Sequence, residues 1–161
     1  NNSKQVFSKN LLLIMDYYNL TSYKSLSELL KISESTVKYW ILMYWAPRLS
    51  VLDEVANQLK VETYRLLKPD IAKHELYSFD GENSSRINFK VAFKAILLEK
   101  YKKRLSSDEI SAKLKGLVSI DTVNSYKRSK NAIVPSIQKL DQIADSLNVK
   151  SYELIQPLKG E

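Results

Sequence analysis

Apolar residues recur every three or four positions along almost the whole chain, which is the spacing of amphipathic α-helices. Over residues 1–69 this spacing predicts five helices, at residues 7–19, 25–31, 34–44, 50–59 and 62–67. Over residues 88–161 it predicts five more, at residues 88–102, 107–115, 120–130, 136–146 and 150–155. No segment alternates apolar and polar residues as a half-buried strand does. The expected fold class is therefore all-α.

Ten positions of the first half recur 88 residues later, each with a residue of the same chemical type. The first set is Pro47, Leu49, Leu52, Val55, Ala56, Leu59, Val61, Tyr64, Leu67 and Pro69. The second set is Pro135, Ile137, Leu140, Ile143, Ala144, Leu147, Val149, Tyr152, Ile155 and Pro157. The motif SESTVKYW at 33–40 also returns 86 residues later, as SIDTVNSY at 119–126. This internal repeat predicts two domains of the same kind, at residues 1–69 and 88–161.

Residues 70–87 separate the two copies and are expected to form a linker. Their turn-forming run, Asp80-Gly81-Glu82-Asn83-Ser84-Ser85, is typical of a domain boundary. Three apolar side chains of this segment are candidates for docking onto a neighbouring domain: Leu76, Tyr77 and Phe79.

Serines and prolines mark the expected starts and ends of the helices. Ser25 and Ser33 are candidate N-caps, because a serine hydroxyl can accept hydrogen bonds from the free amide groups of a first helical turn. Pro47 and Pro135 fall where the chain must leave one helix before it starts the next.

Each copy centres on a short helix, a tight turn and a second helix opened by serine, in LSELLKISESTVKYW at 26–40 and ISAKLKGLVSIDTVNSY at 110–126. Small residues, Ser27 and Ser111, stand where the two helices would cross closely. The expected buried contacts are Leu26, Leu30, Ile32 and Val37 in the first copy and Ile110, Leu114, Val118 and Val123 in the second. With the following PRLSVLDEVANQLKV and PSIQKLDQIADSLNV, this arrangement resembles the helix-turn-helix domains of the lambda repressor, Cro and Xre family. Both copies carry the extended pattern, so the resemblance covers nearly the whole chain.

The resemblance implies that the helices opened by Ser33 and Ser119 lie in the major groove of DNA and present their N-terminal residues to base edges. In the first copy the residues implied to contact DNA are Ser33, Glu34, Ser35, Thr36, Lys38 and Tyr39. In the second copy they are Ser119, Ile120, Asp121, Thr122, Asn124 and Ser125. Asn can bond adenine with two hydrogen bonds, Glu or Asp can accept from cytosine, and Ile or Thr can pack on the thymine methyl group.

A net charge of +7 and a pI near 9.4 favour a polyanionic partner, either nucleic acid or an anionic membrane surface. Residues 88–161 carry 14 basic and 8 acidic residues, a net charge of +6. Residues that follow the second recognition helix are expected to contact the DNA backbone, namely Lys127, Arg128, Lys130 and Asn131. The segment before the second copy's short helix adds Lys100, Lys102, Lys103 and Arg104. The alternative is a basic, solvated helix face.

The first copy differs at the corresponding place. Residues 1–69 have a net charge of only +3, and no cation follows Trp40 until Arg48. Trp40 is expected in the core, but the apolar run after it is too long for one helix face. We expect part of this run to form a protein interface or dimer contact through Ile41, Met43, Tyr44 and Trp45. An enlarged core is the alternative, and on either interpretation DNA binding by the first copy is left open.

The residues of catalysis and cofactor binding do not form motifs in this chain. Cysteine is absent, His74 is the only histidine, and the three glycines do not form a phosphate-binding loop. We therefore expect no enzyme activity, no cofactor and no metal site. No apolar run approaches membrane-spanning length and residues 1–20 do not have the form of a signal peptide, which predicts a cytoplasmic protein without a membrane partner.

These observations predict a sequence-specific regulator of transcription that binds double-stranded DNA. The resemblance implies a repressor-like role in a phage, a mobile element or a bacterial operon. Tandem copies would allow one chain to cover two half-sites, as dimers do. The alternative is an antirepressor or adaptor that binds protein and retains the helix-turn-helix fold, since a fold alone does not decide function.

Overall fold

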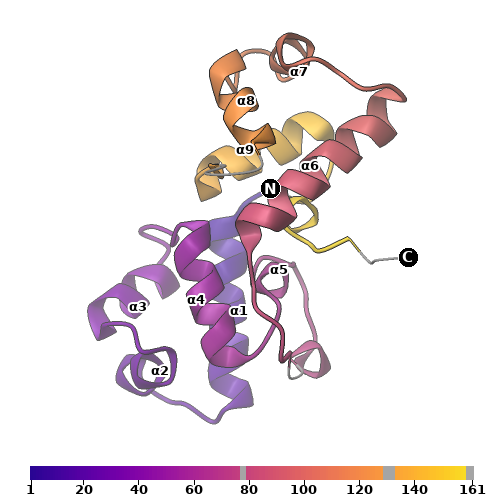
Figure 1. Cartoon of the computed structure of the whole chain (residues 1–161). Helices are drawn as coiled ribbons and strands as arrows, with labels where there is room; N and C mark the ends of the chain where they lie inside the picture. The colour runs from indigo at the N-terminus through magenta and orange to yellow at the C-terminus, as the bar shows by residue number, and fades with distance from the viewer. Residues whose placement is uncertain (77–78, 129–132, 159–161) are drawn as a thin grey trace. The chain divides into compact units, whose positions relative to one another are not determined.

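The protein is described by a computed structural model, which covers residues 1–76, 79–128 and 133–158 (Figure 1). Within these ranges the regular elements are all helical, so the all-α fold class is confirmed. The chain divides into two compact units. The N-terminal unit is Asn2–Ser84, and the C-terminal unit is Ser85–Glu161 together with Asn1.

The elements of the N-terminal unit are α1 (Ser3–Tyr17), α2 (Tyr23–Leu30), α3 (Glu34–Ile41), α4 (Leu49–Leu59), α5 (Thr63–Leu66) and the 3-10 helix η1 (Lys73–Glu75). Helix α2 packs against α3 and α4, and α1 packs against α3 and α5 (Figure 1). Every helix from α1 to α5 contributes to the buried core, which includes Phe7, Leu11, Leu26, Val37, Trp40, Leu52 and Leu66. Burial of these apolar surfaces is the main stabilising contribution to this unit.

The elements of the C-terminal unit are α6 (Ser85–Tyr101), α7 (Ser107–Lys113), α8 (Ile120–Lys127), α9 (Ile137–Leu147) and the 3-10 helix η2 (Ser151–Leu154). Helix α7 packs against α8, and α6 packs against α9 and η2. Because α6 begins at Ser85, residues 85–87 form its first turn and are not part of the linker that the sequence predicted. The core includes Phe89, Phe93, Leu114, Val123, Leu140 and Ile143.

The cap of α2 differs from the sequence-based expectation. Ser22, not Ser25, is the N-cap, and its Oγ accepts a hydrogen bond from Ser25 N at 3.1 Å. Ser25 in turn accepts from Ser22 N at 3.3 Å, so the two serines form a capping box. Ser106 and Glu109 form the same box at the start of α7, with distances of 3.2 and 3.0 Å. Helix α2 therefore starts at Tyr23, two residues earlier than apolar spacing alone indicated.

Helices α3 and α8 are both shorter than predicted. Helix α3 ends at Ile41 because Met43 adopts a left-handed conformation (φ 64°), and Tyr44 N then donates to Tyr39 O at 3.0 Å to close the helix end. Helix α8 ends at Lys127, since Arg128 is extended with φ −61° and ψ 144°. The prediction that these helices reach residues 44 and 130 was therefore wrong.

The segment after α5 belongs to the N-terminal unit. Ile71 and Leu76 are buried, and Phe79 N donates to Lys60 O at 2.7 Å. The Leu76 side chain is thus buried in this unit as expected, whereas Phe79 is half-buried and joined to it through its backbone. Tyr77 lies outside the described residues.

One asparagine side chain ties the end of this segment to the corner between α4 and α5. Asn83 Oδ1 accepts from Thr63 N at 2.9 Å, and its Nδ2 donates to Val61 O at 2.8 Å and to Asn57 Oδ1 at 2.9 Å. The hydroxyl of Thr63 also donates to Asp53 at 2.7 Å. The backbone groups of this corner are thereby satisfied by side chains.

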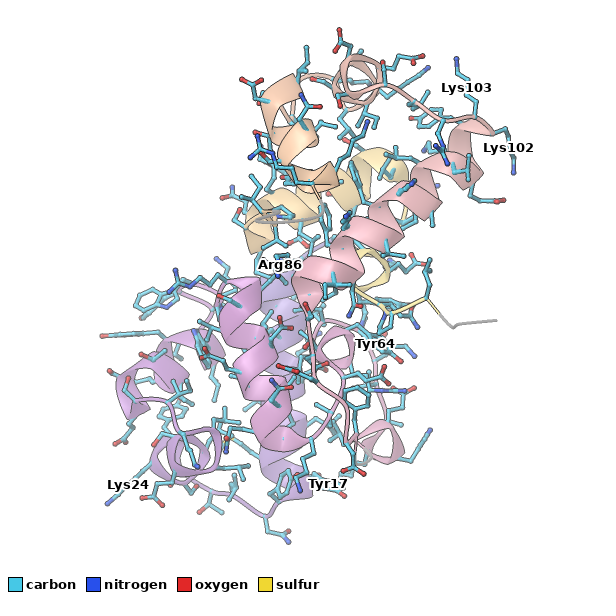
Figure 2. All side chains as sticks on the ribbon, viewed as in Figure 1. Tyr17, Lys24, Tyr64, Arg86, Lys102 and Lys103 are labelled. Atoms are coloured by element: carbon cyan, nitrogen blue, oxygen red, sulfur yellow. The ribbon has the colours of Figure 1, made fainter. Side chains whose placement is uncertain are left out.

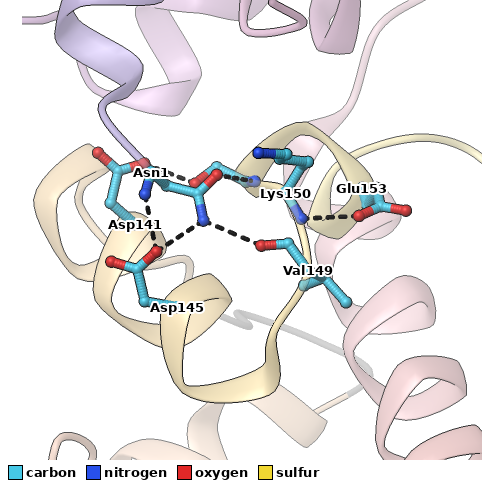
Figure 3. Close-up of polar contacts among 7 residues, drawn as sticks. Asn1, Asp141, Asp145, Val149, Lys150 and Glu153 are labelled. Atoms are coloured by element: carbon cyan, nitrogen blue, oxygen red, sulfur yellow. Dashed lines mark hydrogen bonds and ion pairs between the residues drawn. The ribbon is translucent and has the colours of Figure 1, made fainter.

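The same corner recurs between α9 and η2 of the C-terminal unit, where Asn1 takes the corresponding place (Figure 3). Asn1 Oδ1 accepts from Ser151 N at 2.9 Å, and its Nδ2 donates to Val149 O at 2.9 Å and to Asp145 Oδ1 at 2.8 Å. Ser151 Oγ donates to Asp141 at 2.6 Å. All four partners of Asn1 and Ser151 stand 88 residues after their counterparts, so the repeat extends to individual hydrogen bonds.

Candidate nucleic-acid interface

Helices α3 and α8 are the candidate recognition helices, and both begin with the same cap. Ser33 Oγ accepts from Thr36 N at 3.3 Å and donates to Thr36 Oγ1 at 2.7 Å. Ser119 Oγ accepts from Thr122 N at 3.1 Å and donates to Thr122 Oγ1 at 2.9 Å. The serine and the threonine three residues later thus fix the first turn in both units, and both serines are exposed.

The buried side of each candidate helix carries one valine and one aromatic residue. Val37 and Trp40 of α3 are 0% and 2% exposed, which confirms the expected burial of Trp40. The Trp40 ring meets Phe7 of α1 edge to face at 5.5 Å, and the Tyr126 ring of α8 meets Phe89 of α6 in the same way at 5.0 Å. Burial raises the pKa of Tyr126 to about 12, so its hydroxyl is neutral near pH 7.

Buried apolar side chains stabilise the turn before each candidate helix. Leu26 and Leu30 are buried as predicted, whereas Ile32 is half-buried. In the C-terminal unit all of the predicted contacts are buried: Ile110, Leu114, Val118 and Val123. Ser111 Oγ donates to Val118 O at 2.6 Å and so fastens α7 to the turn, whereas Ser27 Oγ donates within its own helix, to Lys24 O at 2.7 Å. The direction of α8 relative to α7 is therefore fixed by both packing and a hydrogen bond.

The outer face of α8 presents a mixed set of side chains to solvent. Ile120 is 43% exposed, Asp121 and Asn124 are exposed, and Thr122 and Ser125 are half-buried. Asn124 Oδ1 accepts from Ser107 Oγ at 2.5 Å, which orients the amide from the start of α7. Its Nδ2 has no protein partner in the described part of the chain, so this face offers an apolar contact, a carboxylate and an amide donor.

Two cations stand at the end of α8. Lys127 Nζ donates to Ser107 Oγ at 3.1 Å and to Leu105 O at 3.5 Å, so its ammonium group lies over the N-terminal end of α7. Arg128 is exposed and follows the helix in extended conformation. The other two residues predicted here, Lys130 and Asn131, lie outside the described residues.

The basic segment after α6 is partly neutralised by acidic neighbours. Lys102 pairs with Glu99 at 3.0 Å and Lys103 pairs with Glu109 at 3.5 Å. Both lysines project from the end of α6 (Figure 2). Exposed ion pairs are weak, so these lysines keep most of their attraction for a phosphate group.

The outer face of α3 differs from that of α8. Glu34, Ser35 and Lys38 are exposed, and Thr36 and Tyr39 are half-buried. The Tyr39 ring lies 4.6 Å from the Trp45 ring and 5.5 Å from the Tyr44 ring, measured between centroids. Tyr39 is therefore part of an aromatic cluster and not a free side chain at the tip of a helix.

Residues after α3 form an exposed apolar surface, which we call the aromatic surface. It comprises Leu42, Met43, Tyr44 and Trp45, which are 40%, 42%, 62% and 49% exposed, together with Tyr39. Ile41 is half-buried. The run following Trp40 is thus mostly outside the core, and an enlarged core does not account for it.

One contributor to the candidate interface was not predicted from the sequence. Ser107 contacts both Asn124 and Lys127, and so links the start of α7 to the exposed face of α8. A local signal exists, since Ser107 follows the cap residue Ser106 and precedes two acidic residues of a first helical turn. Its partners lie in another helix, however, and only the packing of α7 on α8 brings them together.

His74, the only histidine of the sequence, lies in η1. Within the described residues, no group of three or more His, Cys, Asp or Glu side chains could hold a metal ion. Among the helices described, none is both long and apolar enough to cross a membrane.

Comparisons with protein-family models, with curated proteins and with solved structures find no match.

Proposed function

We propose that this chain is a transcriptional regulator that binds duplex DNA through tandem helix-turn-helix domains of the lambda repressor, Cro and Xre type. The observation that carries this proposal is the exposed face of α8, with an ordered cap at one end and cations at the other. Such a helix fits the major groove, where N-terminal residues reach base edges and flanking cations hold phosphates. The repeated scaffold in α2–α3 and α7–α8 supports the same assignment for both units.

In this proposal the C-terminal unit carries most of the DNA affinity. Asn124 is the residue best placed to read a base, because Ser107 holds its amide and its Nδ2 is available to a base acceptor. Ile120 would pack on a thymine methyl group, and Arg128 would contact the backbone. Salt would then weaken binding steeply, since each neutralised phosphate releases counterions.

The test is selection of bound sequences from random DNA duplexes with the full chain, followed by affinity measurements at several salt concentrations. Arg128→Ala should weaken binding to all sequences and lower the salt slope by about 1. Asn124→Ala should cost about 1–3 kcal/mol on the selected site and relax the preference at one base pair. Lys150→Gln, a charge change at the N-cap of η2, is the matched control and should leave the affinity unchanged.

Two outcomes of this selection decide between one and two DNA-binding units. Two half-sites at a fixed spacing would mean that both α3 and α8 read DNA. A single site that Asn124→Ala alters and Lys38→Ala does not would assign DNA binding to the C-terminal unit alone. An affinity that does not change with salt would contradict the proposal as a whole.

The aromatic surface favours a second candidate function for the N-terminal unit, which is contact with another protein or a second copy of this chain. Exposed aromatic and methionine side chains are enriched in protein interfaces and depleted elsewhere on surfaces. If it is a self-association surface, Trp45→Ser should convert a dimer to a monomer in sedimentation analysis without changing how α8 reads DNA. An antirepressor would instead lack DNA affinity and retain a protein complex that Trp45→Ser disrupts.

A further inference from the structure

A groove of about 280 Å³ lies in the C-terminal unit, between α6, the turn before α7, and the end of α8. Its apolar lining is formed by Phe93, Leu97, Leu98, Leu105, Ile110 and Tyr126. Small-ligand pockets span about 300–1,000 Å³ and are mostly apolar with a few polar groups. The groove therefore suits a compact ligand with one ring or a short chain.

Every charged residue at the rim of the groove is basic. Lys90 and Lys94 stand one turn apart on α6, Lys103 and Arg104 follow that helix, and Lys127 ends α8. No carboxylate lines the groove. In the described part of the chain no ion pair is formed by Lys90, Lys94 or Arg104. Cations around an apolar hollow concentrate the positive potential there, and this attracts an anion.

Comparison of the two units shows which residues of this groove the shared fold does not require. The long helices α1 and α6 correspond at an interval of 82 residues, since both begin with a buried serine, Ser3 or Ser85. Lys90 and Lys94 then correspond to Ser8 and Leu12 of the N-terminal unit, where Ser8 Oγ donates to Ile41 O at 2.6 Å. The same scaffold thus forms without these cations.

Two further differences between the units also concern groove residues that the shared fold does not require. Lys127 corresponds to the uncharged Ile41, and the aromatic residue before it is Trp40 in one unit and the smaller Tyr126 in the other. A basic rim and a smaller aromatic side chain therefore occur together in the C-terminal unit. Neither is required for packing the long helix against its candidate recognition helix.

We propose that this groove binds a small amphipathic anion, a compact apolar group carrying one anionic group. The apolar part would lie on Phe93 and Leu97, and the anion would face Lys90, Lys94 and Lys127. Because Lys127 also ends α8, the bound anion would reduce the attraction of this end for DNA phosphates. This regulatory consequence rests on the proposed DNA-binding function, whereas ligand binding does not.

Octanoate, with its eight-carbon chain and single carboxylate, is a suitable probe. Titrated into the isotopically labelled full chain, it should give saturable shifts of backbone amide signals in residues 90–98, 103–110 and 126–127. The uncharged analogue 1-octanol should bind at least fivefold more weakly. Equal affinities for the two compounds, or shifts without saturation, would overturn the proposal.

Variants of the rim and the lining test the assignment to this groove. Lys90→Gln with Lys94→Gln should weaken octanoate binding about tenfold, whereas Lys150→Gln should leave it unchanged. Tyr126→Trp introduces the aromatic residue of the other repeat and should reduce octanoate affinity by filling the groove. Lys94 is exposed and Lys90 is half-buried, and neither belongs to the core, so their double variant remains informative if Tyr126→Trp does not fold. Unchanged octanoate affinity in the double variant would contradict the assignment.

DNA affinity measured with and without octanoate separates this proposal from the previous one. Octanoate at saturation should weaken DNA binding severalfold, and DNA should weaken octanoate binding by the same factor. Saturable octanoate binding without any DNA affinity would support the ligand site and contradict the proposed DNA-binding function. DNA binding that is weakened by the lysine variants, together with no octanoate binding, would overturn the ligand site and assign these cations to phosphate contacts.

Discussion

At the scale of single residues, the most informative side chains are the serines that open α3 and α8. Each accepts a hydrogen bond from the backbone of a threonine three residues later, and each is exposed to solvent. A cap of this kind satisfies an amide group that has no partner within the helix. Ser33 and Ser119 therefore stabilise the same part of the molecule that would approach DNA, and substitutions can separate the two roles.

Ser119→Ala should lower the free energy of unfolding of the C-terminal unit by about 1 kcal/mol, because the cap is lost. Ser119→Asp should retain stability, since aspartate caps as well as serine, but should weaken DNA binding by placing a negative charge near phosphates. Urea denaturation followed by circular dichroism, and DNA titration, measure the two effects. If Ser119→Ala and Ser119→Asp lost the same stability, the loss could not be attributed to removal of the cap.

At the scale of elements, the sequence predicts the cores of the helices better than their ends. Apolar spacing found every α-helix of the described residues, and the buried faces of α3 and α8 agree with the repeat. The end of α3 was missed because Met43 is left-handed, a conformation for which methionine has no preference. The link between Ser107 and α8 and the corner around Asn83 were missed because they join residues that are distant in sequence.

The corner held by Asn83 gives a prediction at this scale. Asn83→Ala should lower the free energy of unfolding of the N-terminal unit by about 2 kcal/mol, since Thr63 N and Val61 O lose their side-chain partner. The Thr63 amide should also exchange its hydrogen faster with solvent deuterium. Glu82→Ala, at the exposed neighbouring residue, is the control and should change neither quantity. Unaltered exchange at Thr63 in Asn83→Ala would contradict this account of the corner.

At the scale of the whole molecule, the chain has two cores built from matched residues. Leu52 and Leu140 stand 88 residues apart in the sequence and are both fully buried, one in each unit. A unit with its own core can unfold with its own free energy. The repeat in the sequence predicts this pairing of core residues, while it does not reveal the different surfaces that the two units carry.

Leu52→Ala and Leu140→Ala should each cost about 2–5 kcal/mol, through lost burial and the cavity left behind. Hydrogen exchange along the chain should show Leu52→Ala accelerating exchange within Asn2–Ser84 and Leu140→Ala within Ser85–Glu161. A uniform acceleration over the whole chain in both variants would mean that the chain unfolds as one cooperative unit.

The matched caps and buried positions of α3 and α8 also make this chain suitable for grafting. Ser33, Thr36, Val37 and Trp40 have the same structural roles as Ser119, Thr122, Val123 and Tyr126. The intervening solvent-facing residues can therefore be transplanted from one helix to the other while the scaffold of the recipient is preserved. If the proposed function holds, a chimera that carries the outer residues of α8 on α3 would show whether DNA specificity is contained in those few side chains. Such chains would then be starting points for engineered DNA-binding proteins with two chosen half-sites.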